Sequence, residues 1–167
     1  MASLVNHLFF IHSFLFLLPK VLSSSVADAI QFLKDAGVPG FDDADGTIFF
    51  LRKIDQLFDL LNSRSSFGKG FKRPLSLGWI DIWTDVIDSS CHYLEGLTAP
   101  NGIPLKHHAK KTFIKRFLLT AQSTKHLVKW LLTREFHPFK YFLTYKLSQD
   151  HVELLFRCIR GKDTTVT

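Results

Sequence analysis

The sequence predicts a mainly α-helical chain, in which a helical bundle is followed by one strand–helix piece. Apolar residues recur at helical spacing through most of residues 23–135, and clusters of glycine and proline separate these stretches. An aromatic, β-leaning segment at residues 141–145 then leads into a last helical pattern. With 167 residues, 46% of them hydrophobic, the chain is long enough to bury one hydrophobic core, and a second core is not expected.

Residues 1–25 contain an apolar run that is closed by Pro19 and Lys20 and followed by small residues, a pattern typical of a secretory signal peptide. The run is too short to span a bilayer comfortably as a helix, so no membrane association is expected beyond this segment. Against a signal peptide, no Lys or Arg precedes the run, His12 lies within it, and no cysteine framework follows. Two alternatives stay open, a spurious extension and the remnant of a longer chain.

Two amphipathic helices are expected next. The first begins after Ser23, a good N-cap, and stops at Gly37. The second covers residues 47–62 with a stripe at 3.6-residue spacing, made of Ile48, Leu51, Ile54, Leu57, Phe58 and Leu61. The aspartates before it suit a helix N-terminus rather than a calcium loop, because no glutamate occupies the twelfth position.

A loop rich in glycine, serine and cations is predicted at residues 62–76. Such a loop can approach phosphates through its backbone N–H groups and through Lys69, Lys72 and Arg73. It lacks the Walker A spacing, and an ordinary exposed connection has the same composition.

A third helix is expected at residues 77–94, with Gly96 as its stop, and a turn at residues 98–104. Residues 107–135 follow as a helix in two pieces that meet at Ser123 and Thr124, and lysines fill the side opposite its apolar face. The adjacent pair His107 and His108 is a poor metal chelate, because neighbouring helical side chains diverge by about 100°.

Charge is unevenly distributed. Residues 1–105 carry eight Lys/Arg against eleven Asp/Glu, whereas residues 106–146 carry ten against one. The second half therefore suits a polyanionic partner such as DNA. Solvated faces of amphipathic helices explain the same lysines.

The last helical pattern follows Ser148, which is placed as an N-cap. Asp150 and Glu153 share its first turn. Two such carboxylates can hold a divalent metal through hard oxygen ligands. Alternatively, Asp150 favours the helix N-terminus and Glu153 pairs with Arg157. Cys91 and Cys158 lie far apart in the sequence and are expected to be free thiols.

Two stretches together, residues 45–75 and 141–160, resemble the P element type, THAP-related DNA transposases. The first reads DGTIFFLRKIDQLFDLLNSRSSFGKGFKRPL and the second contains TYKLSQDHVELLF. In that family a largely helical GTP-binding insertion domain interrupts an RNase H-like catalytic domain. The resemblance runs from about Val21 to Arg160 with both motifs in the family's order.

The resemblance implies a role for several residues. Glu153 is similar to the last acidic ligand of the transposase Mg²⁺ site, and Asp150 is a neighbouring carboxylate that faces the metal or the nucleotide. Phe58 looks like the aromatic residue that stacks on guanine, with Asp59 accepting from N1–H and the exocyclic amine and Asn62 adding hydrogen bonds. Ser24 lines the same pocket in this scheme. Core packing is the alternative role for Phe58.

The departures from the family predict a transposon-derived piece without independent catalysis. The family's two earlier catalytic aspartates and its zinc-coordinating DNA-binding module have no counterpart here. Two-metal strand cleavage needs several converging carboxylates, which one glutamate cannot replace. DNA, guanine nucleotide and a second copy of the chain are the partners to consider, in the nucleus by resemblance, or in the secretory pathway if residues 1–25 are a signal peptide.

These expectations divide the chain into four parts. Residues 1–20 form the N-terminal extension and residues 21–105 the region like the GTP-binding insertion. Residues 106–140 form a basic helical region, and residues 141–167 the RNase H-like strand–helix piece. Two other functions stay open, a non-catalytic basic nucleic-acid-binding module and a secreted small helical protein.

Overall fold

The computed structural model describes residues 21–99, 102–105, 107, 111–148 and 158. Helices dominate this part of the chain, as the sequence predicts, and its only β-pairings are two isolated bridges. The chain separates into two compact units, residues 1–58 and 59–167, and each is described by itself. The division into four parts made from the sequence stays a prediction.

The first unit is built on helix α2 (Ser24–Asp35) and most of helix α3 (Asp45–Leu61). Ser23 caps α2 as predicted, since its hydroxyl accepts from the backbone N–H of Val26 at 3.4 Å. Gly37 follows the helix with φ +68°, a backbone angle that only glycine adopts without strain. One buried cluster of this unit consists of Ala27, Ile48 and Leu51 with partly buried neighbours, and Ile54 and Leu57 are also buried on α3.

The second unit begins with the end of α3 and the predicted loop. A short 3₁₀-helix, η1 (Gly70–Lys72), lies within this loop. At Gly68 the backbone passes so close to Lys72 that a Cβ would lie 2.2 Å from the Lys72 carbonyl oxygen. Only glycine fits there, which fixes the shape of the loop.

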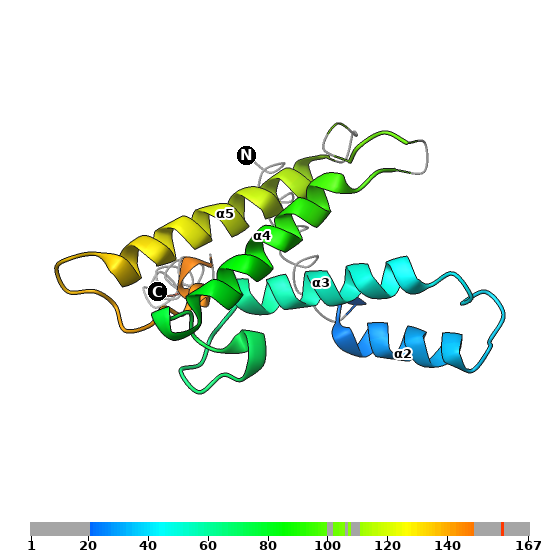
Figure 1. Cartoon of the computed structure of the whole chain (residues 1–167), viewed down its shortest axis with the longest axis horizontal. Helices are drawn as coiled ribbons and strands as arrows, with labels where there is room; N and C mark the ends of the chain where they lie inside the picture. Colours follow the sequence, from blue (N-terminus) through cyan, green and yellow to red (C-terminus); the bar gives the residue numbers. More distant parts are fainter. Residues whose placement is uncertain (1–20, 100–101, 106, 108–110, 149–157, 159–167) are drawn as a thin grey trace, which may run out of the picture. The chain divides into compact units, whose positions relative to one another are not determined.

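A helical hairpin follows the loop. The 3₁₀-helix η2 (Leu77–Trp79) leads into helix α4 (Ile80–Gly96), which packs against helix α5 (Lys111–Thr133) (Figure 1). The predicted turn between them contains an antiparallel bridge of Thr98 with Pro104. Trp83 is fully buried in this hairpin, and its indole N–H donates to the Ser76 carbonyl at 3.1 Å.

The prediction that the basic helix would be in two pieces is wrong. Helix α5 continues through Ser123 and Thr124 without interruption. Thr124 is buried together with Ile114, Ala121, Val128 and Leu132, which lie at helical spacing. Packing of this stripe against α4 outweighs the low helix propensity of serine and threonine.

The predicted strand at residues 141–145 is also wrong. Phe142 forms a single bridge with Leu75, and the chain then enters the 3₁₀-helix η3 (Thr144–Leu147). The ladder cannot lengthen on one side, because the N–H of Arg73 already donates to the Gly70 carbonyl at 3.4 Å. On the other side, Leu77 begins the 3₁₀-helix η2. Neither Arg73 nor Leu77 can therefore pair with the segment that contains Phe142.

Some predictions concern residues outside the described part of the chain. They include the N-terminal extension, residues 1–20, and the helix predicted after Ser148. Among the described residues, none of the helices has the length and apolarity needed to cross a membrane. Cys91 and Cys158 are free, as predicted, and burial raises the pKa of the Cys91 thiol.

Candidate functional site

The residues that the sequence assigns to guanine recognition lie at the end of α3. Phe58 and Asp59 are successive residues in the last turn of this helix, and Asn62 follows directly after it. All three side chains are partly buried. The amide oxygen of Asn62 accepts from the Arg64 guanidinium at 3.0 Å.

Ser24 lies against a residue that sequence analysis missed. Its hydroxyl donates to Asp55 Oδ2 at 2.5 Å, and its backbone N–H donates to the same oxygen at 3.1 Å. Asp55 is placed three residues before Phe58 on the same helix. The i, i+3 spacing puts both side chains on one helical face, and that spacing is the signal that could have identified Asp55.

Asp59 faces the glycine-containing loop. Lys72 Nζ lies 3.7 Å from Asp59 Oδ1, and the exposed fractions of the two side chains are 69% and 22%. The sequence marked Lys72 as a candidate for phosphate contact but gave no reason to pair it with Asp59. The structure thus brings a predicted base-recognising carboxylate next to a predicted ligand-binding cation.

The other two cations of the loop differ from Lys72. Lys69 is exposed. The Arg73 guanidinium lies over the Trp79 ring at 3.7 Å from its centroid, and within the described part of the chain its buried Nε has no hydrogen-bond partner. Arg73 is therefore held within the fold, whereas Lys69 is accessible to a ligand.

Ser63 and Thr144 join the end of α3 to the segment that contains η3. The Thr144 hydroxyl donates to the Leu60 carbonyl at 2.6 Å and accepts from the Ser63 backbone N–H at 2.9 Å. The Tyr145 N–H donates to the Ser63 carbonyl at 3.2 Å. Ser63 and Thr144 are 0% and 1% exposed, so these bonds are shielded from water. No periodicity in the sequence indicates this junction.

The predicted metal ligands Asp150 and Glu153 lie outside the described residues. Among the residues that are described, no group of three or more His, Cys, Asp or Glu side chains could hold a metal ion. Ser148, predicted as the N-cap of that helix, has a buried hydroxyl for which the described residues supply no hydrogen-bond partner.

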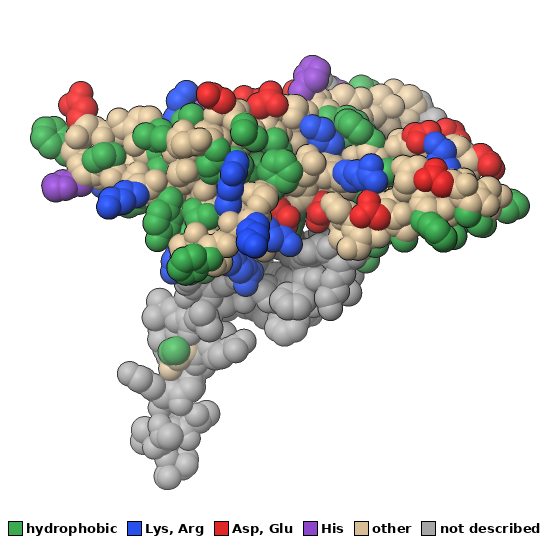
Figure 2. Space-filling model, turned by 60° about the horizontal axis from the view of Figure 1, so that its bottom comes forward, with side chains coloured by type: hydrophobic (Ala, Val, Ile, Leu, Met, Phe, Trp, Pro, Cys, Tyr) green, Lys and Arg blue, Asp and Glu red, His purple; other side chains and the backbone are tan. Residues whose placement is uncertain are grey.

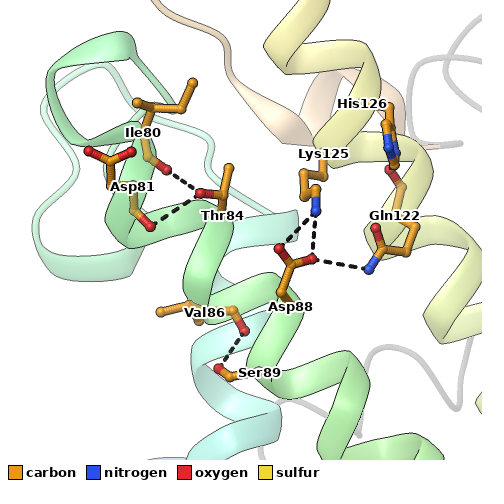
Figure 3. Close-up of polar contacts among 9 residues, drawn as sticks. All are labelled: Ile80, Asp81, Thr84, Val86, Asp88, Ser89, Gln122, Lys125 and His126. Carbon is orange, nitrogen blue, oxygen red and sulfur yellow. Dashed lines mark hydrogen bonds and ion pairs between the residues drawn. The ribbon is translucent and has the colours of Figure 1, made fainter.

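The basic character of the second half is visible on the surface of α5. Lys115, Arg116 and Lys129 are exposed on this helix, and Trp130 is 60% exposed between them and the helix end. A different view, with the lower side of Figure 1 turned forward, also shows Lys and Arg side chains among exposed hydrophobic ones (Figure 2). Lys125 is only 19% exposed and binds Asp88 of α4 (Figure 3).

Two families of known proteins match the chain. One is described as the TNP-like GTP-binding insertion domain and matches residues 15–74. The other is described as the TNP-like RNase H C-terminal domain and matches residues 145–164. The hydrogen bond between Tyr145 and Ser63 therefore connects the two matched segments, and Thr144 directly precedes the second one.

A human protein aligns with nearly the whole chain. The human protein named DNA transposase THAP9 is 36% identical over 161 residues, which are 96% of this chain and 17% of the human protein. The chain thus spans about one sixth of the length of this relative. No solved structure matches the chain.

Proposed function

Since the chain is related to the P element type, THAP-related DNA transposases through a GTP-binding insertion segment and an RNase H C-terminal segment, we propose that it binds a guanine nucleotide at the end of α3. The observation that carries this proposal is the position of Asp59. Its partly buried carboxylate lies in the last turn of α3 and faces a loop of glycines and cations. Such a carboxylate accepts two hydrogen bonds from guanine, from N1–H and from the exocyclic amine.

The surrounding residues take complementary roles in this proposal. Phe58 stacks on the base, and Asn62 supplies hydrogen bonds next to Asp59. Ser24 keeps its role by resemblance only, and within the first unit its hydroxyl is oriented by Asp55. Lys69 is accessible for the phosphates.

Titration with a fluorescent GTP analogue tests the site. Asp59→Ala removes hydrogen bonds to a charged group, and we expect the affinity to fall by about tenfold or more. Asp85→Ala is the matched control, because Asp85 is an exposed aspartate on α4. This variant should bind the GTP analogue with the affinity of the wild type. Equal affinity of wild type and Asp59→Ala would rule out this site, provided that circular dichroism shows both to be folded.

Mg²⁺ binding belongs to the RNase H C-terminal segment in this proposal, with Glu153 and Asp150 as carboxylate ligands. Two-metal strand cleavage requires further carboxylates that converge on the same ions. We therefore expect no cleavage of transposon-end DNA by this chain alone in the presence of Mg²⁺. Reproducible cleavage that is abolished by Glu153→Gln would contradict this expectation.

A second function, DNA binding through α5, is favoured by the exposed cations Lys115, Arg116 and Lys129. Three phosphate contacts contribute about 2.7 to the slope of log affinity against log salt concentration. Replacing these three residues with alanine should lower the slope by about that amount, whereas Ser123→Ala on the same helix should leave it unchanged. Binding that does not depend on salt would exclude this function. DNA as a partner implies a nuclear location.

A further inference from the structure

The ion pair between Lys72 and Asp59 is placed to recognise one particular base. The Lys72 side chain is 69% exposed and its Nζ lies 3.7 Å from the carboxylate, at the long end for an ion pair. Exposed pairs of this kind contribute little to stability. Lys72 can therefore exchange this contact for a ligand at small cost in free energy.

The backbone of Lys72 is nevertheless held in place. Its carbonyl accepts from the Ser63 hydroxyl at 2.9 Å, and its N–H donates to the Lys69 carbonyl at 3.1 Å. Ser63 is itself fully buried, and Gly68 packs directly against the Lys72 carbonyl. The root of the side chain is thus fixed beside Asp59 while its amine faces solvent.

The chemistry of this pair is complementary to the edge of guanine. On that edge the O6 acceptor lies next to the N1–H and amine donors, whereas adenine presents an amine donor in place of O6. A carboxylate only accepts hydrogen bonds, and an ammonium group only donates them. A neighbouring carboxylate and ammonium therefore match guanine and mismatch adenine.

We propose that Lys72 is a specificity-determining residue of the nucleotide site, which donates to O6 of guanine while Asp59 accepts from N1–H and the amine. This inference rests on the proposed nucleotide site. It assigns Lys72 to the base and leaves Lys69 to the phosphates, although composition alone gives both lysines the same role.

The test is the ratio of GTP affinity to ATP affinity, measured by competition with the fluorescent GTP analogue. Lys72→Met should lower this ratio by about tenfold, because the lost hydrogen bond involves a charged donor and only guanine receives it. Affinity for ITP, which keeps O6 and N1–H, should fall by the same factor as affinity for GTP. Lys72→Arg keeps a donor and should retain most of the ratio.

Lys69→Met is the matched control, since it removes the same charge from the same loop. It should lower the affinities for GTP and ATP equally and leave their ratio unchanged. A Lys72→Met protein with the wild-type ratio would overturn the role of Lys72, even if Asp59→Ala abolished binding. Absence of GTP binding to the wild type would instead contradict the nucleotide site itself.

Discussion

Two aspartate–lysine pairs in the same compact unit show how differently one pair of residue types is used. In the α4–α5 hairpin, Lys125 Nζ lies 2.6 and 2.8 Å from the two oxygens of Asp88, and its side chain is only 19% exposed (Figure 3). Gln122 donates to the same carboxylate at 3.3 Å. At the end of α3, by contrast, Lys72 lies 3.7 Å from one oxygen of Asp59 and is 69% exposed.

The difference lies in the elements that carry the lysines. Lys125 extends from a long helix that packs against α4, the helix that carries Asp88. Its amine therefore contacts both oxygens of the carboxylate. Lys72 extends from a short loop that fixes its backbone and leaves its amine in water. The first pair links two packed helices, and the second can exchange its contact for a ligand.

The largest expected effect tests whether the hairpin is the rigid region. Trp83→Ala leaves a cavity in the core of α4 and breaks the hydrogen bond to the Ser76 carbonyl, which should lower the free energy of unfolding by about 3–5 kcal/mol. Phe67 in the loop is 89% exposed, and Phe67→Ala should change the same quantity by less than about 0.5 kcal/mol. Urea denaturation measures both. Similar losses for the two variants would remove the distinction between the regions.

An intermediate effect is expected at the junction behind the loop. Thr144→Val keeps the side-chain shape but leaves the Leu60 carbonyl and the Ser63 N–H without a partner, at a cost of about 1–3 kcal/mol. Thr133→Val is the control, because its exposed hydroxyl bonds only within its own helix, to Lys129 at 2.9 Å. A Thr144→Val protein as stable as the control would mean that water replaces the lost bonds.

The smallest effect concerns pH. The hydrogen bond from Lys125 lowers the pKa of Asp88 from its ordinary value of 3.8, and the bond from Gln122 acts in the same direction. Folding therefore favours the ionised carboxylate, so the stabilisation is present above pH 3.8 and is lost as pH falls through the folded pKa.

Removing the Asp88 carboxylate should make the free energy of unfolding depend less on pH in the acid range. Because Asp88 is half exposed, Asp88→Asn should differ from the wild type by less than about 1 kcal/mol at neutral pH and should converge with it in acid. Unfolding measured between neutral pH and pH 2 checks this, with Asp85→Asn as the control. A gap that widens as pH falls would reverse the assignment.

Local signals in the sequence predicted the helices well. The Ser23 cap, the helix α3 and the stop at Gly37 depend on residues within a few positions of one another, and these predictions are confirmed. Most of the predicted stripe of α3 is buried, but Phe58 and Leu61 are only partly buried and Leu60 is buried instead. The predicted strand is wrong because strand formation requires a paired segment, and the segment around Leu75 and Arg73 is far away in the sequence. Aromatic composition favours extended backbone but cannot supply a partner strand.

The candidate site was predictable only in part. Family resemblance identified Asp59 and Asn62, and composition identified Lys72, yet nothing in the sequence linked Lys72 to Asp59 or Ser63 to Thr144. These contacts depend on tertiary packing, which local spacing does not encode. The guanine-contacting and metal-binding roles of the predicted residues stay predictions.

The bonds made by Thr144 also bear on how the chain folds. They connect residues 81 and 84 positions apart, so the end of α3 acquires its partner only after the whole α4–α5 hairpin has been synthesised. Contacts of such long sequence separation slow folding, because a large loop must close before they form. At a synthesis rate of about 5–20 residues per second, several seconds pass between synthesis of the end of α3 and synthesis of Thr144.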